Sequence, residues 1–279
     1  MIEHSPKSQH ANRVDEFRRL HQPGSPLLLP NAWDLASARM LITSGYQAIG
    51  TTSRGVAYAA GKPDAAGKTR DETLILAQDL AGLDCLITVD VEAGFTDDQA
   101  DIVDLARELA SIGVVGINIE DGSPAGGLRP TKETVGKIRA IKNAVPDLFI
   151  NARTDSYWVT DGAGDLGETL ARAQAYVEAG ADGIFVPSLG NLDAITQVTS
   201  TITAPLNILH QAGGPNVETL AAAGVARISS GSFLFRTAMA AIATTMAAIK
   251  RGDQNYPWST ATDQELGNSG PSGSRNNPT

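Results

Sequence analysis

Two carboxylic acids stand at the end of an apolar run, in the stretch LITVDVEAGF at residues 86–95. Asp90 and Glu92 are two residues apart, and side chains with that spacing point to the same face of a strand. Acids in such a position often hold a metal ion, and they often merely cap the helix that follows. Other residues of the chain are needed to distinguish between these two interpretations.

Further residues that could take part in chemistry follow later apolar runs. Asp90, Glu92 and Glu120 form a hard, oxygen-rich set without Cys or His, which favours magnesium or manganese over zinc. Magnesium keeps several waters, so one direct carboxylate with two others bound to its waters is chemically sensible. Arg153 offers a planar fork for a carboxylate or phosphonate. This set suits a 2-oxo acid, because a cation stabilises an enolate oxygen while Arg153 fixes the acid group.

The elements that position these residues alternate between short apolar runs and amphipathic stretches. An N-terminal helix is predicted over residues 9–21. Eight strands are predicted at 27–30, 46–51, 85–90, 114–121, 148–155, 183–188, 205–209 and 227–230. Helices are predicted at 33–44, 70–81, 97–112, 131–143, 166–179, 191–200, 216–223 and 232–250. Asp97 is expected to cap the third of these helices, and a glycine-rich loop is expected before residue 70.

The strands read as continuous apolar runs, as expected for a parallel sheet that is buried on both faces. Eight strand–helix units in this length predict a (β/α)8 TIM barrel, formed as one domain by residues 1–253. A doubly wound open sheet is the alternative, but no Gly-x-Gly-x-x-Gly turn follows the first strand. Residues 254–279 are polar and rich in Gly, Ser, Asn and Pro, which predicts a disordered tail.

In such a barrel the loops after the strands form the active site, so polar residues at strand ends are the candidates. They are Asn31, Thr51, Thr52, Ser53, Asp90, Glu92, Glu120, Asp121, Arg153, Asp155, Ser188, Asn207, His210, Ser229 and Ser230. Asn31 and Asn207 are predicted to contact the substrate, whereas His210 is interpreted as a solvated loop histidine. A weaker phosphate-binding alternative comes from the last two loops, in Gly213, Gly214, Ser230 and Gly231. A Schiff-base aldolase needs a lysine at a strand end, and no predicted strand supplies one.

Composition excludes several function classes. The net charge is −9 with a pI near 4.9, and basic runs are missing, which argues against nucleic acid or an anionic membrane as a partner. The single cysteine, Cys85, excludes an intrachain disulfide and a cysteine-based zinc cluster. The first residues do not resemble a signal peptide, and the apolar stretches are expected to be too short to span a bilayer. A cytoplasmic protein is therefore expected. Met239 and Met246 stand on an alanine-rich last helix, where packing is the expected role.

Several motifs together resemble the isocitrate lyase and phosphoenolpyruvate mutase superfamily. They are LPNAWDLASARM at 29–40, TTSRGVAYAAGKPD at 51–64, TRDETL at 69–74, TVDVEAGF at 88–95, GINIEDG at 116–122, INARTD at 150–155 and EAGADGIFVPS at 178–188. The resemblance implies a magnesium-dependent barrel enzyme that acts on small 2-oxo or 2-hydroxy acids through an enolate. It also implies a homotetramer in which the last helix is swapped between neighbours.

The resemblance also implies roles for individual residues. Asp90 matches the direct metal ligand, and Glu92 and Glu120 match the acids that hold the metal through water. Residues matched to substrate contacts are Thr52, Ser53, Gly55, Asp64 and Arg153. Asp64, Glu120 and Arg153 are therefore expected to be catalytic.

One loop departs from the pattern of the isocitrate-cleaving branch. That branch carries a Lys-Lys-Cys-Gly-His type loop after the fourth strand, where this chain has DGSPAGGLRP at 121–130. Without the Cys, cleavage of isocitrate or methylisocitrate is disfavoured. The lysine and asparagine of the phosphonate mutases are missing too. The sequence favours a lyase that acts on an oxaloacetate-like acid and yields pyruvate. The alternatives are P–C bond chemistry of the phosphoenolpyruvate or carboxyphosphonoenolpyruvate mutase type, and a non-catalytic relative that binds a small acid.

Overall fold

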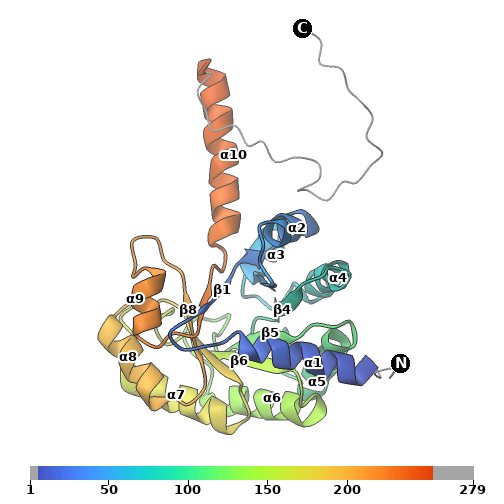
Figure 1. The fold of residues 1–279 in the computed structure, drawn as a ribbon, viewed down its shortest axis with the longest axis vertical. Helices are drawn as coiled ribbons and strands as arrows, with labels where there is room; N and C mark the ends of the chain where they lie inside the picture. The colour runs from blue at the N-terminus through green and yellow to red at the C-terminus, as the bar shows by residue number, and fades with distance from the viewer. Residues whose placement is uncertain (1–5, 254–279) are drawn as a thin grey trace.

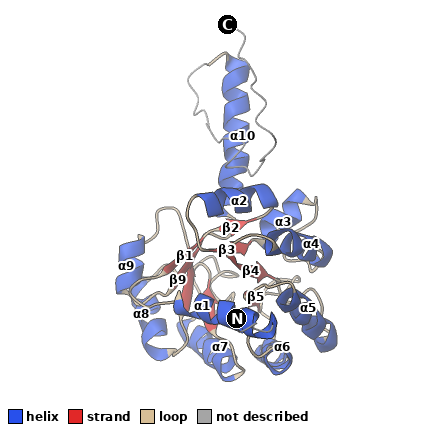
Figure 2. Cartoon of the chain, turned by 45° about the vertical axis from the view of Figure 1, so that its right-hand side comes forward, coloured by secondary structure: helices blue, strands red, loops and turns tan. Residues whose placement is uncertain are grey.

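A ring of parallel strands surrounds the centre of the protein in the computed structural model, which describes residues 6–253 (Figure 2). The strands are β1 (Leu27–Leu29), β2 (Asn31–Ala32), β3 (Ala48–Thr51), β4 (Leu86–Asp90), β5 (Gly116–Glu120), β6 (Phe149–Arg153), β7 (Gly183–Val186), β8 (Leu206–Leu209) and β9 (Arg227–Ser229). Their order is β1-β9-β8-β7-β6-β5-β4-β3-β2, and every neighbouring pair is parallel.

The ring closes through a strand that is interrupted at Pro30. β1 pairs with β9 on one side, and β2 pairs with β3 on the other. Proline has no N–H to donate, yet its carbonyl accepts a hydrogen bond from Gly50 N at 2.9 Å. β1 and β2 therefore share one position in the barrel, and the predicted (β/α)8 architecture is confirmed.

Helices surround the strands. They are α1 (Pro6–Arg19), α2 (Leu35–Thr43), α3 (Ser53–Ala59), α4 (Arg70–Ala81), α5 (Gln99–Ser111), α6 (Thr131–Ala144), α7 (Leu166–Glu178), α8 (Leu192–Thr201), α9 (Val217–Ala222) and α10 (Phe233–Arg251). Most bounds lie within a few residues of the prediction. α3 occupies part of the stretch predicted as a glycine-rich loop, and that prediction was wrong. A Cβ on Gly55 would lie 2.7 Å from Trp33 Cβ, so close packing against residue 33 explains a glycine inside this helix.

The cap of α5 also differs from the prediction. Asp98, not Asp97, accepts the hydrogen bond from Ala100 N at 2.7 Å, because Asp98 directly precedes the first helical residue. Asp97 instead receives Arg129 Nη1 at 2.6 Å and Lys137 Nζ at 3.3 Å. The predicted capping role of Asp97 was wrong, and this residue links α5 to α6.

α1 covers the amino-terminal end of the barrel. Phe17 is fully buried and meets the ring of Phe149 edge-on, with ring centroids 5.2 Å apart. His21 stacks on Phe149 at 4.6 Å, and Arg18 Nη2 donates to the carbonyl of Asp147 at 2.9 Å. An apolar plug with a polar rim thus closes the end of the barrel opposite the strand carboxyl ends.

α10 extends away from the barrel (Figures 1 and 2). Its apolar side chains are solvent-exposed, with Met239 at 42%, Ile242 at 58% and Met246 at 59% exposure. Met239 and Met246 therefore do not pack within this chain, and their packing against another copy stays a prediction. Within residues 6–253, α10 is the one helix long and apolar enough to cross a membrane by length and composition. The expectation that all apolar stretches are too short was wrong on that point, although such a helix is weak evidence for a membrane span. The predicted tail at 254–279 lies outside the described residues.

The plug formed by α1 leads to a prediction about stability. Replacing Phe17 by Ala removes a buried aromatic ring and leaves a cavity, so the free energy of unfolding should fall by about 3–5 kcal/mol. The exposed Ile75 on α4 provides a control, because Ile75→Ala should change stability by less than about 0.5 kcal/mol. Urea unfolding at one fixed protein concentration measures both. Equal stability of the two variants would show that α1 does not close the barrel.

Candidate active site

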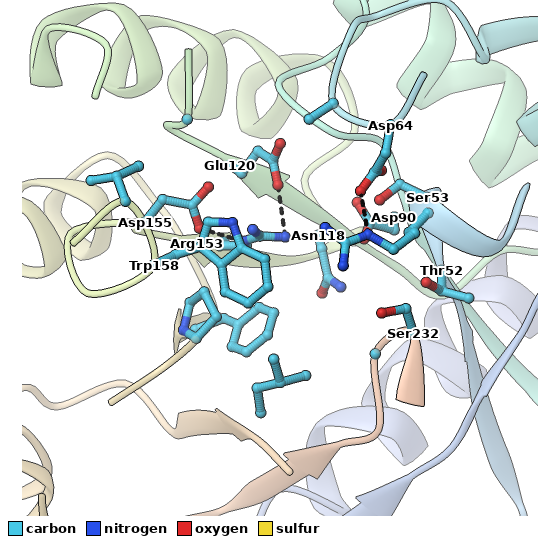
Figure 3. Close-up of a pocket in the computed structure, with 18 of the residues that line it drawn as sticks. Thr52, Ser53, Asp64, Asp90, Asn118, Glu120, Arg153, Asp155, Trp158 and Ser232 are labelled. Carbon is cyan, nitrogen blue, oxygen red and sulfur yellow. Dashed lines mark hydrogen bonds and ion pairs between the residues drawn. The ribbon is translucent and has the colours of Figure 1, made fainter. Parts of the chain in front are cut away.

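A cavity of about 490 Å³ lies at the carboxyl ends of the strands (Figure 3). It is called the inner pocket below. The structure brings together most of the predicted site residues, and those that line the inner pocket are Asn31, Thr52, Ser53, Asp64, Asp90, Glu120 and Arg153. They come from five different strands or their following loops, as the barrel prediction requires.

Glu92 does not line the inner pocket, although it stands two residues after Asp90. The strand ends at Asp90, and the backbone of Glu92 takes a left-handed conformation with φ of 50°. The same-face rule of a strand therefore does not apply to it. Its carboxylate accepts hydrogen bonds from Gly67 N and Thr69 Oγ1, both at 2.8 Å, and borders a smaller cavity that Glu120 also borders. Glu92 thus fixes the loop before α4.

Two predicted substrate contacts also lie outside the inner pocket lining. Gly55 is buried inside α3, packed against Trp33. Asn207 is 1% exposed, and its Oδ1 accepts a hydrogen bond from Ser229 Oγ at 3.1 Å. Asn207 pairs in register with Arg227, two residues before the last residue of β9. Its side chain therefore belongs to a polar layer within the barrel, below the residues that face the cavity.

Arg153 occupies the centre of the charged residues in the inner pocket. Its Nη1 pairs with Glu120 Oε2 at 2.7 Å, and its Nε donates to Asp155 Oδ1 at 2.6 Å. Register explains the first pair, because Glu120 and Arg153 are direct partners on β5 and β6. The guanidinium carbon also lies 5.6 Å from the centre of the Trp158 ring, within range of a cation–π contact.

Burial dominates the electrostatics of this cluster. Burial raises the pKa of Glu120 to about 8; Arg153 opposes this rise, and the nearby carboxylates of Asp155 and Asp90 add to it. Burial also raises the pKa of Asp90, against the opposing effect of Arg153. Burial by itself would lower the pKa of Arg153, but Glu120 and Asp155 outweigh it, so the guanidinium stays charged. The cluster is therefore richer in acid than its arginine can neutralise.

A second ion pair lies across the inner pocket from Arg153. Arg54 Nε donates to Asp64 Oδ2 at 2.9 Å, which connects the start of α3 to the loop before α4. The guanidinium of Arg54 lies 5.8 Å from the Trp158 ring centre. Both guanidinium groups therefore lie within cation–π range of Trp158, and Figure 3 shows Trp158 beside Arg153.

Asp121 supports the site from behind. It is fully buried and accepts hydrogen bonds from Tyr176 Oη at 2.6 Å and Arg172 Nη1 at 3.2 Å. Its other oxygen accepts from the backbone N of Asp155 at 2.7 Å. Asp121 thus fixes the loop that carries Asp155, and it does not line the inner pocket.

Some residues of the inner pocket were not predicted as site residues. The main ones are Arg54, Asn118, Trp158 and Ser232. A signal existed for Asn118, which stands two residues before Glu120 on the same strand and so shares its inward face. Asp155 was noted at a strand end without a role. Trp158 and Ser232 lie in loops whose path the sequence pattern does not fix.

The comparisons with known proteins identify the family. The family model for phosphoenolpyruvate phosphomutase matches residues 17–250. The chain belongs to the phosphoenolpyruvate mutase/isocitrate lyase superfamily. It is 41% identical over 238 residues to an uncharacterized protein of Mycobacterium tuberculosis, covering 85% of this chain and 90% of that protein. An oxaloacetate decarboxylase of Pseudomonas putida is 30% identical over 265 residues, covering 90% of this chain and 89% of that enzyme.

A solved structure of the superfamily agrees with this fold. A candidate phosphonomutase from Burkholderia cenocepacia J2315 superposes with a TM-score of 0.81 at 36% identity, covering 85% of this chain and 99% of that one. Similar members of the superfamily thus include a decarboxylase and a phosphonomutase-like protein. Their names describe breakage of different bonds, so membership of the superfamily establishes the fold and leaves the exact reaction to the site itself.

The raised pKa of Glu120 predicts how stability depends on pH in metal-free protein. A carboxyl whose pKa rises from 4.5 to about 8 on folding stabilises the folded state below pH 4.5, and this contribution disappears as pH rises towards 8. Wild-type stability should therefore fall relative to Glu120→Gln between about pH 5 and 8, by up to about 1.4 kcal/mol per pH unit. Urea unfolding in chelator at several pH values measures the difference.

Glu16→Gln is the matched control for this experiment, because Glu16 is an exposed acid on α1. Its stability should run parallel to the wild type across the same pH range. If the stability of Glu120→Gln also runs parallel to that of the wild type, folding does not raise the pKa of Glu120.

Proposed function

We propose that this protein is a magnesium-dependent lyase that acts on a small 2-oxo acid through an enolate, by decarboxylation or C–C cleavage. An oxaloacetate-like acid is the favoured substrate, with pyruvate as the product. The observation that carries the proposal is the inner pocket itself, where Arg153 is fixed by Glu120 and Asp155 while Asp90 faces the same cavity. The similarity to the oxaloacetate decarboxylase of Pseudomonas putida supports it.

The residues of the inner pocket fit a magnesium or manganese ion. Their donors are carboxylate oxygens, which these hard cations prefer, and the acids outnumber the arginine between them. Oδ1 of Asp64 is buried without a hydrogen-bond partner among the described residues. No group of three His, Cys, Asp or Glu side chains within residues 6–253 could enclose a metal. One direct ligand with water-mediated contacts does not need such a group, so we assign Asp90 as the direct ligand and Glu120 as a water-mediated one. Glu92 lies outside the inner pocket, and we assign it a water-mediated contact from the smaller cavity that Glu120 also borders.

A cation bound there would withdraw electron density from the 2-oxo group of the substrate. The protein's own residues fix the acid group. Glu120 and Asp155 occupy Nη1 and Nε of Arg153, which leaves Nη2 to bind a substrate carboxylate. Thr52, Ser53 and Asn31 line the same cavity and can donate hydrogen bonds to the remaining oxygens. Loss of carbon dioxide leaves an enolate, which takes up a proton from water in the pocket.

Two alternatives to the proposed lyase are P–C bond chemistry and binding without turnover, and the short loop after β5 bears on the choice between them. Residues 121–130 contain no Cys, Lys or His, so this loop supplies no acid or base of the type found in the isocitrate-cleaving branch. P–C bond chemistry is favoured by the similarity to the Burkholderia cenocepacia protein, and binding without turnover is favoured by the missing groups. Pyruvate release from a panel of 2-oxo diacids and phosphonates distinguishes these outcomes.

We further propose that α10 is buried between copies of this chain in a helix-swapped homotetramer. An exposed apolar helix is costly in water, and its side chains need a partner. The apolar face also explains why the helix resembles a membrane span in composition. The cytoplasmic location stays a prediction.

The tetramer can be tested through α10. Ile242→Glu places a charge in the proposed interface and should reduce the mass measured in solution from about four times to about one or two times 29.1 kDa. Lys250→Glu changes an exposed charge at the end of the same helix and should keep the wild-type mass. Multi-angle light scattering gives both masses. A monomeric wild type would refute the swapped assembly.

The metal role of Asp90 can be tested separately. Asp90→Asn removes the charge of the proposed direct ligand with little change in shape, so kcat/KM for pyruvate release should fall by roughly a thousandfold or more. Asp79→Asn changes an exposed aspartate on α4 and should leave the rate unchanged. Isothermal calorimetry of Mg²⁺ binding provides a readout that does not need the substrate. Turnover that survives both the Asp90 variant and chelation would eliminate the metal-assisted mechanism.

A further inference from the structure

A second cavity opens beside the inner pocket, between the loop after β8 and the start of α10. Its volume is about 490 Å³, and it is called the outer groove below. The residues that define it include Arg54, Trp158, Leu209, His210, Ser232 and Arg236. Arg54, Trp158, Leu209 and Ser232 also line the inner pocket, so the two cavities share a wall and adjoin each other.

The two cavities differ sharply in charge. The inner pocket is lined by two arginines, Arg54 and Arg153, and by four carboxylates, those of Asp64, Asp90, Glu120 and Asp155. Among the described residues, no Asp or Glu lines the outer groove, whereas Arg54, His210 and Arg236 do. An anionic group away from Arg153 would therefore be repelled by the carboxylates of the inner pocket and attracted to the outer groove.

Within a single copy of this chain, the basic side chains of the outer groove are accessible. Arg236 is exposed on the first turns of α10, and no ion pair or hydrogen bond of its side chain is found within residues 6–253. His210 is also exposed, and its ring lies edge-on to Phe233 with centroids 5.2 Å apart. Arg54 uses Nε for Asp64, which leaves both of its Nη atoms outside that pair.

Two guanidinium groups lie within cation–π range of Trp158, and both line the inner pocket. Arg153 lies 5.6 Å from its ring centre among carboxylates, and Arg54 lies 5.8 Å from it at the entrance to the outer groove. A molecule that reaches past Trp158 can therefore present one acid group to Arg153 and a second one to Arg54 and Arg236. A four-carbon diacid is short enough to place both carboxylates within the inner pocket.

We propose that the outer groove binds a second, distal anionic group of the substrate. Besides an oxaloacetate-like acid, the protein then accepts longer 2-oxo or 2-hydroxy acids, and among these it favours one that carries a distal carboxylate or phosphonate. This inference rests on the proposed function, because it assumes that the 2-oxo acid end occupies the inner pocket. Arg236 is the residue that determines the preference, since it is the cation of the groove that lies outside the inner pocket and has no carboxylate beside it.

The test uses two ligands of equal chain length that differ only in the distal charge. These are 2-oxoadipate and 2-oxohexanoate, whose binding to the magnesium-loaded protein is measured by calorimetry. Neither carries a carboxylate beta to the oxo group, so decarboxylation does not disturb the measurement. The wild type should bind 2-oxoadipate about tenfold more tightly, which corresponds to one charge-assisted hydrogen bond at a partly exposed site.

Arg236→Gln should remove most of this preference, by weakening 2-oxoadipate and leaving 2-oxohexanoate unchanged. Arg236→Glu should reverse it. Arg251→Gln is the matched control, because Arg251 is an exposed arginine at the far end of the same helix. Equal affinity of the wild type for the two ligands would overturn the proposal. An Arg236→Gln variant that weakens both ligands alike, or that changes the mass in solution, would also overturn it by showing that Arg236 acts on the fold or on an interface.

Failure of this inference can be told apart from failure of the proposed function. Oxaloacetate turnover without any preference for the distal charge would overturn the outer groove alone. A clear preference for 2-oxoadipate without turnover of any 2-oxo acid would support the outer groove and contradict the lyase. The binding experiment needs no turnover, so the two results are independent.

Discussion

The site depends on one buried guanidinium held between two carboxylates. Arg153 and its partners Glu120 and Asp155 are almost completely removed from water, and a charge in that position is costly unless its partners are held in place. Two separate devices hold them. Strand register places Glu120 directly beside Arg153, and Asp121 binds the backbone of Asp155 from behind. The position of Arg153 is therefore set by the barrel itself and not by a mobile loop.

Preorganisation of this kind has a chemical consequence. An arginine whose Nε and Nη1 are already engaged has little freedom left to lose when a substrate carboxylate binds to Nη2. The same pairs leave the cluster with more acid than base, and burial makes that excess unfavourable. A divalent cation would relieve it. The same arrangement of charges therefore positions Arg153 for a substrate carboxylate and favours binding of a divalent cation.

Much of the fold could be predicted from the sequence, because each strand carries its own local signal. Continuous apolar runs that end in polar residues indicated both the barrel and its reactive end, and Asp90, Glu120 and Arg153 were found in this way. The exceptions have local causes. Glu92 was placed by extending a strand that in fact ends at Asp90, where the backbone turns left-handed. Asn207 was taken for a rim residue, although it lies one layer deeper, beside Arg227.

Contacts between distant segments were beyond the reach of the sequence. Arg54 stands inside a motif that was matched for its neighbours, Ser53 and Gly55, and nothing in that stretch indicates that Asp64 and Trp158 will meet it. α3 was missed for a similar reason, since its internal glycine reads as a loop until Trp33 packs against it. Register and periodicity specify which face of an element is buried. They do not specify which loops converge.

The residues around Trp158 can supply the substrate recognition that the short loop after β5 does not provide. Where that loop carries few groups able to recognise a substrate, recognition has to come from other parts of the rim. Near Trp158 the rim holds the acidic inner pocket, which suits a cation and the reacting end of a 2-oxo acid, and the outer groove, which contains Arg54 and Arg236. The 2-oxo acid end suits Arg153 and a cation bound in the inner pocket, and the distal acid suits the outer groove, so an elongated diacid has one favourable orientation. The distance between Arg153 and Arg236 can then determine which chain length of substrate is preferred. The residues that enolate chemistry requires stay the same.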